Sequence, residues 1–180
     1  MLKIVMSKYG GIFQKKSERP RIRPVRTWID HLFDFAMLDF VLFGIGYAIW
    51  AYPSLPATIP TKFNSAGQAT STGPAWTIFM LPAIGLVLCS GLRLIQRWPW
   101  ISNTIISITK ENAERQYQLI NRLLGFCGAF VALLFLIIEI SMVRGAGGNP
   151  SALGMTMGLV AVFPWPLVLA WYFWQSFKAA

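Results

Sequence analysis

Residues 119–143 read LINRLLGFCGAFVALLFLIIEISMV, and this stretch decides the fold. Its only charged residues are Arg122 and Glu139. Because about 20 apolar residues in a helix cross about 30 Å of hydrocarbon, the stretch predicts a transmembrane helix. Similar apolar runs lie at about 35–51, 76–95 and 153–177. Together the four runs predict an all-α integral membrane protein, folded as a four-transmembrane-helix bundle.

The composition of the whole chain agrees with a membrane location. Of its 180 residues, 55% are hydrophobic and 13% are charged, whereas an average soluble domain has about 25% charged residues. The chain lacks the charged surface that keeps a protein of this size in solution. We therefore expect the lipid bilayer to be its environment.

Basic residues flank the apolar runs and account for the net charge of +9. Eight of the 16 Lys and Arg residues lie in residues 1–26, which we interpret as a basic cytoplasmic arm. Residues 27–180 then form the membrane domain, with an outer loop at 52–75 and a cytoplasmic loop at 96–118.

The distribution of charge also predicts an orientation. With the N-terminus inside, fourteen basic residues lie in inner segments and only Lys62 and Arg144 lie outside. Because Lys and Arg concentrate in the cytoplasmic segments of membrane proteins, we expect a multi-pass protein of the bacterial cytoplasmic (inner) membrane with both termini in the cytoplasm.

Several classes of function are disfavoured by what the sequence lacks. No nucleophile stands beside a base, and His31 is the only histidine. Cys89 and Cys127 each sit inside an apolar run, where cysteine behaves as a small hydrophobe, and with one histidine they do not make a zinc set. The basic residues form no DNA-binding motif. We expect a non-enzymatic protein without cofactor, metal or nucleic-acid partner.

The outer loop carries the most specific pattern, YPSLPATIPTKFNSAGQATSTGPA at residues 52–75. Prolines favour an extended path, Gly67 can take a positive φ and reverse the chain, and Asn64 can bond its own backbone two residues on. Phe63 would thereby be held above the bundle. The candidate binding residues of the loop are Pro56, Ile59, Pro60, Phe63, Asn64 and Gly67. Two interpretations stay open: a recognition surface for another protein, or a structural cap.

This loop resembles the bacterial membrane domain-of-unknown-function family 1648, which is found in SdpI-like membrane proteins. The resemblance rests on Leu55-Pro56, Ile59-Pro60, Phe63-Asn64 and Gly67, with support from the run at 108–112 and from Tyr117. It spans roughly residues 35–140 and implies a role akin to immunity against, or sensing of, a secreted peptide. Lys62 stands where the family often has histidine, and the chain is expected to lack the SdpI C-terminal region.

Two carboxylates fall within predicted spans. Asp39 lies inside the first span, where a charge costs about 2.5–3.5 kcal/mol on insertion scales, so we expect it to face the bundle interior. Its candidate partners are Arg93, Arg97 and Arg122, and a place in an ion path is the alternative. Glu139 lies near the outer end of the third span, where it is expected to reach the headgroups or Arg144.

The sequence thus predicts a protein that acts by binding a membrane or secreted protein through its outer loop or helix faces. Such a protein could be an accessory subunit of a membrane complex or have an immunity-like or sensing role. The alternative is a small ion-coupled transporter that uses Asp39 and Glu139.

Overall fold

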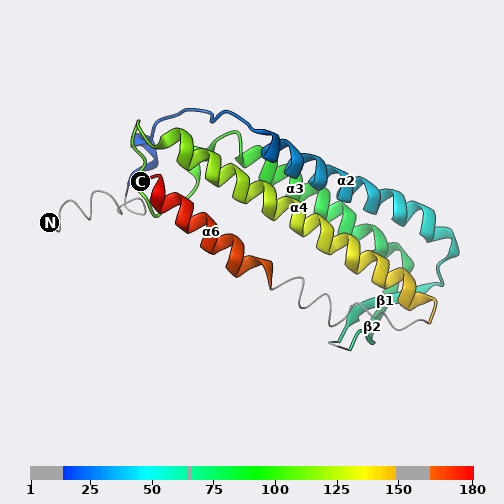
Figure 1. Ribbon diagram of the computed structural model, residues 1–180. Helices are drawn as coiled ribbons and strands as arrows, with labels where there is room; N and C mark the ends of the chain where they lie inside the picture. The colour runs from blue at the N-terminus through cyan, green and yellow to red at the C-terminus, as the bar shows by residue number, and fades with distance from the viewer. Residues whose placement is uncertain (1–13, 65, 149–162) are drawn as a thin grey trace.

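The computed structural model describes residues 14–64, 66–148 and 163–180, and they are mostly helical. Three long helices lie side by side, with a shorter helix along one of them and a small hairpin at one end (Figure 1). The helices are α2 (Trp28–Ala51), α3 (Met80–Ile95), α4 (Ala113–Ala146) and α6 (Pro164–Lys178). The hairpin pairs β1 (Thr58–Phe63) with β2 (Ala69–Pro74), and short 3-10 turns are η1 (Lys16–Glu18), η2 (Tyr52–Ser54), η3 (Ala75–Phe79) and η4 (Pro99–Ile101). We call the two ends of the bundle the hairpin end and the basic end, the latter being where Arg26, Arg93 and Arg122 lie.

Three helical segments are long and apolar enough to cross a bilayer. They are Trp28–Ser54, Ala75–Ile95 and Ala113–Ala146, and they contain the first three predicted spans. The protein is therefore a multi-pass membrane protein by length and composition. The fourth predicted span, 153–177, lies partly outside the described residues, and its described part is the 15-residue helix α6.

Helix α4 is the centre of the bundle, because α2, α3, α6 and β1 all contact it. Small residues bring the backbones close. A Cβ added at Gly125 would lie 3.1 Å from Phe33 Cβ on α2, and one added at Gly85 would lie 3.4 Å from Phe135 Cδ2 on α4. Helices in lipid associate by such close packing, because the lipid tails are as apolar as the side chains and offer no hydrophobic gain.

The outer loop was expected to be extended and turn-rich, but it folds into an antiparallel hairpin. Pro60 of β1 lies opposite Thr72 of β2, and the register of the two strands shifts on either side of Lys62. A strand proline is tolerated here because each strand of a two-stranded sheet has a free edge. The buried side chain of Ile59 fills the space among Ala48, Ala51 and other apolar residues at the end of the bundle. The hairpin therefore packs onto the helices.

The basic end is closed by the described part of the N-terminal arm. The Gln14 amide donates to Ile108 O and accepts from Ile108 N–H, both at 2.8 Å. Tyr117 donates its hydroxyl to Pro20 O at 2.9 Å. Residues 14–27 thus lie against the segment that joins α3 to α4, whereas residues 1–13 of the predicted arm are outside the described residues. Helix α4 begins at Ala113, after Thr109 and Asn112 form a reciprocal turn, so it starts before the predicted span at 119–143.

The close approach of α2 and α4 leads to the first prediction. A leucine at Gly125 must displace Phe33 and Gln96, both of which lie within 3.5 Å of the new Cβ. Overpacking of this kind costs about 1–3 kcal/mol, so Gly125→Leu should lower the melting temperature in detergent. Gly91→Leu is the matched control, since a Cβ at Gly91 meets nothing within 4 Å. Equal melting temperatures of the two variants would contradict the packing described.

Candidate functional site

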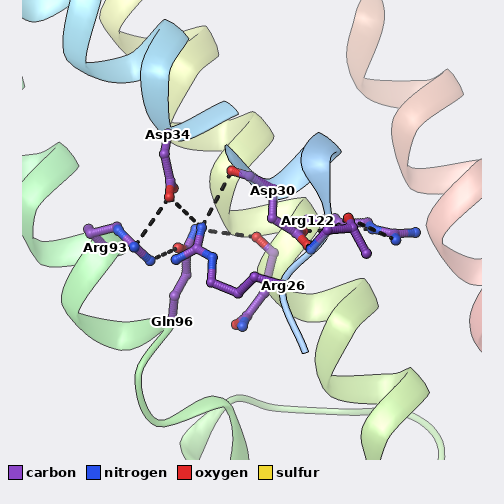
Figure 2. A network of polar contacts seen from close by, with 8 residues as sticks. Arg26, Asp30, Asp34, Arg93, Gln96 and Arg122 are labelled. Carbon is purple, nitrogen blue, oxygen red and sulfur yellow. Dashed lines mark hydrogen bonds and ion pairs between the residues drawn. The ribbon is translucent and has the colours of Figure 1, made fainter. Parts of the chain in front are cut away.

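A network of charges joins α2, α3 and α4 at the basic end. Figure 2 shows Arg26 between the two aspartates of α2, where its guanidinium pairs with the Asp34 carboxylate and donates to Asp30 O at 3.4 Å. Arg93 of α3 reaches Asp34 at 3.3 Å, and Arg122 of α4 lies 3.7 Å from Asp30. Residues 26, 30 and 34, which are four residues apart, thus form one polar face that pairs with both neighbouring helices.

The start of α2 places these aspartates. Asp30 accepts from the Thr27 N–H at 2.6 Å and from the Thr27 hydroxyl at 2.8 Å, so it satisfies a backbone donor that the first helical turn leaves free. Its carboxylate is 6% exposed. The same side chain therefore caps α2 and anchors Arg122, which fixes the depth of α2 against α4.

An amide extends the network to the other side of α3. Arg93 donates to Gln96 Oε1 at 3.0 Å, and Gln96 donates to Asn121 O on α4 at 3.3 Å. Among the described residues the charges of the network are paired and the Gln96 amide is bonded, so the network acts as a structural clamp between α2, α3 and α4.

Asp39 does not face the bundle interior, which corrects the expectation from sequence. It lies on the exposed side of α2, while Met37 and Val41 on either side of it are buried. Two of the three arginines expected as its partners are engaged elsewhere, Arg93 with Asp34 and Arg122 with Asp30, and Arg97 makes no ion pair with it among the described residues. No ion pair or hydrogen bond to the Asp39 side chain occurs within the described part of the chain.

The position of Asp39 along α2 makes this exposure costly. It stands near the middle of the 24-residue helix, about 17 Å along the axis from either end at about 1.5 Å per residue. The carboxylate opens into a groove of about 900 Å³. The groove is lined by Asp39, Phe40, Leu42, Phe43, Gly46, Tyr47, Trp50 and Leu136. A carboxyl group thus sits on an apolar, aromatic surface near the middle of the candidate membrane span Trp28–Ser54.

Glu139 also differs from the expectation. Its side chain is 1% exposed, so it does not reach the headgroups, and no ion pair joins it to Arg144 among the described residues. It faces α2 and α3 instead, because a Cβ at Gly44 would lie 2.9 Å from Glu139 Oε2 and 3.6 Å from Pro82 Cβ. Its Oε1 is buried without a hydrogen-bond partner in the described part of the chain. The sequence signal that could have indicated the position of Glu139 is Gly44, a residue without a side chain within the first predicted span, where another helix can approach closely.

The outer-loop residues take mainly structural positions. A Cβ at Gly145 of α4 would lie 3.0 Å from Pro60 and 3.3 Å from Phe63, so both residues pack on the end of that helix. Ile59 is fully buried, whereas Pro56 is exposed. This placement agrees with the interpretation as a cap, and recognition through the loop stays a prediction.

Asn64 and Gly67 form the hairpin turn. The Asn64 side-chain oxygen accepts from the N–H groups of Ala66 and Gln68 at 3.0 and 2.9 Å, and Gly67 has φ +77°. The predicted bond from Asn64 to the backbone two residues on, and the reversal at Gly67, are both confirmed.

A sequence model of the domain of unknown function DUF1648 matches residues 40–86. The matched region covers the second half of α2, the hairpin, η3 and the start of α3. The resemblance drawn from the loop is thereby confirmed over this region, which is narrower than 35–140 and contains neither Asp39 nor Glu139. No curated protein and no solved structure matches the chain.

Replacement of aspartate by alanine should have different effects on stability at Asp30, inside the ion network, and at Asp39, outside it. Asp30→Ala removes the cap of α2 and leaves Arg122 without its carboxylate, so it should destabilise the purified protein by about 1–3 kcal/mol. Asp39→Ala removes an unpaired carboxylate from a lipid-exposed position, so it should leave the melting temperature in detergent unchanged or raise it. A loss of stability in Asp39→Ala equal to that in Asp30→Ala would mean that Asp39 is paired inside the bundle.

Proposed function

We propose that this multi-pass membrane protein with a DUF1648 match binds another membrane protein through the exposed face of α2 around Asp39. The observation that carries the proposal is a carboxyl group at the middle of α2 that pairs with no other described residue and lies on an exposed face of the helix. Ionisable residues within membrane spans almost always face a bundle interior or a water-filled cavity and pair there. A partner helix that supplies the missing pair would turn this face into an interior.

The groove around Asp39 suits a helix as its occupant. Phe43 stacks on Tyr47 with ring centroids 6.3 Å apart, and Tyr47 lies 5.7 Å from Trp50. These rings form a ridge along the helix, and Gly46 leaves space beside them. The complementary partner is a transmembrane helix with a Lys, an Arg or a strong hydrogen-bond donor at mid-depth. The protein would then be a non-enzymatic accessory subunit, with an immunity-like or sensing role as a narrower possibility.

We favour the α2 face over the hairpin as the docking surface, because the hairpin residues of the family pattern pack against the bundle or form the turn. Ile59, Pro60 and Phe63 contact the bundle, and Asn64 and Gly67 make the turn. The exposed surface of the hairpin is left with polar side chains such as Lys62 and Gln68. A secreted partner would meet that polar surface, and a membrane partner would meet α2.

We further propose that the basic end lies in the cytoplasm of a bacterium and that the fourth span returns the chain there. Fourteen of the 16 Lys and Arg residues support this orientation. Gln116 at the start of α4 bonds Ser176 near the end of α6 twice, at 2.8 and 2.7 Å. These bonds support a C-terminus on the same side as the start of α4.

Ion-coupled transport is a second candidate, favoured by one observation. Phe40 and Leu136 line both the groove at Asp39 and the small cavity at Glu139, so the two carboxylates belong to neighbouring spaces. A transporter predicts that the purified protein in liposomes dissipates a proton gradient and that Asp39→Asn stops it. If liposomes that contain the protein keep their proton gradient, ion-coupled transport is ruled out.

A photo-crosslinker tests the docking face. Benzoylphenylalanine at Phe43, which is 60% exposed, should capture a membrane protein with a basic residue inside one of its spans. Adding Asp39→Asn should reduce that capture by about tenfold or more, since each 1.4 kcal/mol of lost pairing is tenfold in affinity. The same probe at Val87 on α3, 70% exposed, is the control and should yield lipid adducts. Capture that is unaffected by Asp39→Asn, or capture of a second copy of this chain, contradicts the proposal.

Thiol labelling tests the orientation. Single cysteines replace Thr70 in β2 and Lys110 before α4, two residues that are both exposed. A membrane-impermeant maleimide should label position 70 in intact spheroplasts and position 110 only after lysis. Cys89 is buried and Cys127 half-buried in the bundle, so the parent protein gives the background. Labelling of position 110 in intact spheroplasts would contradict the proposed orientation.

A further inference from the structure

We infer that Glu139 is an intramembrane proton-binding site, in which a cavity shared by α2, α3 and α4 holds the neutral carboxylic acid together with one water molecule. The inference goes beyond the docking proposed at Asp39 and holds whether or not a partner binds there.

Burial and the lack of a partner are the first observation. The side chain of Glu139 is 1% exposed, and its Oε1 has no hydrogen-bond partner among the residues that the structure describes. A buried carboxylate that is neither paired nor hydrogen-bonded is so unfavourable that such groups neutralise instead. The neutral acid removes the charge and gains one O–H donor.

The neighbouring helices make room for the carboxyl but offer it no charge. Gly44 has no side chain at the point of closest approach, 2.9 Å between its virtual Cβ and Glu139 Oε2. Pro82 of α3 has no backbone N–H to donate. The other residues that line the cavity are apolar or glycine: Phe40, Val41, Leu81, Gly85, Ala132, Phe135 and Leu136. The pocket therefore suits a neutral group.

No charged or titratable group near Glu139 in the described part of the chain forms an ion pair that would neutralise a carboxylate there. Tyr47 on α2 lies within electrostatic reach of both Glu139 and Arg144. Arg144 is exposed near the end of α4 and makes no ion pair with Glu139 among the described residues. Asp39 on α2 opens into the neighbouring groove, and no residue of α3 that lines the cavity is titratable.

The size of the cavity selects the ligand. Its volume of about 10 Å³ is at the lower limit for one water molecule, about 10–15 Å³. That water can accept from the acid O–H or donate to Oε1. A hard cation such as Ca²⁺ takes six to eight oxygen ligands, and one carboxyl group is the only acidic side chain lining the cavity. The donor set therefore favours a proton over a metal ion.

Infrared spectroscopy of the full-length protein in liposomes tests the site. At neutral pH the wild type should show the C=O band of a protonated carboxyl that is absent from Glu139→Gln, an isosteric variant that keeps the helix packing. Asp39→Asn is the control and should retain this band. Gly44→Ala, which puts a methyl group against Oε2, should shift the band, whereas Gly46→Ala should not, because nothing lies within 4 Å of a Cβ there.

Chemical modification gives an independent readout. Dicyclohexylcarbodiimide adds the protonated carboxylic acid across its C=N bond, the acid proton moves to nitrogen, and rearrangement gives a stable N-acylurea. Mass spectrometry should locate this adduct on Glu139, and raising the pH should slow its formation. An acid band unchanged in Glu139→Gln overturns the inference, as does a band that responds to sodium concentration at fixed pH or that is not shifted by Gly44→Ala.

Discussion

The structure depends on one constraint: the hydrocarbon core contains no water, so charges that enter it must be neutralised by the protein. At the basic end the chain meets this constraint with its own side chains. Asp30 and Asp34 of α2 hold Arg122 of α4 and Arg93 of α3, and Arg26 bridges the two aspartates (Figure 2). Because each partner comes from a different helix, the same pairs that neutralise charge also fix the depth of α2, α3 and α4 relative to one another.

That depth determines where the remaining carboxylates lie. With α2 anchored at Asp30, Asp39 lies on the exposed face at the middle of the helix, and Gly44 lies at the level of Glu139. At the opposite end, the hairpin packs Pro60 and Phe63 onto Gly145 of α4. The bundle is therefore closed by polar pairing at one end and by apolar packing at the other. Asp39 and Glu139 are left as two carboxyl groups that the described chain does not pair, one turned outward from the middle of α2 and one enclosed near the end of α4.

Much of this fold could be predicted from the sequence, and the exceptions have a common cause. The apolar runs located the first three spans, and the turn formed by Asn64 and Gly67 was predicted from the residue types. The rotation of α2 about its axis could not be predicted, because its apolar residues cover all sides of the helix and leave no distinct core face. Asp39 was therefore assigned to the wrong side. Glu139 was misplaced because its pocket exists only where Gly44 and Pro82 of two other helices meet it. The hairpin was missed because Pro60 disfavours a strand except where an edge is free.

The measurement that tests this account most directly is the oxygen accessibility of nitroxide spin labels on α2 in the purified protein, reconstituted in liposomes without a partner. Labels are placed singly at positions 37, 39 and 41 in a variant in which Cys89 and Cys127 are replaced by alanine. The account predicts a mobile, oxygen-accessible label at 39 and immobile, inaccessible labels at 37 and 41, since Met37 and Val41 are 7% and 4% exposed. An immobile label at 39 that oxygen does not reach would place Asp39 inside the bundle and contradict the account.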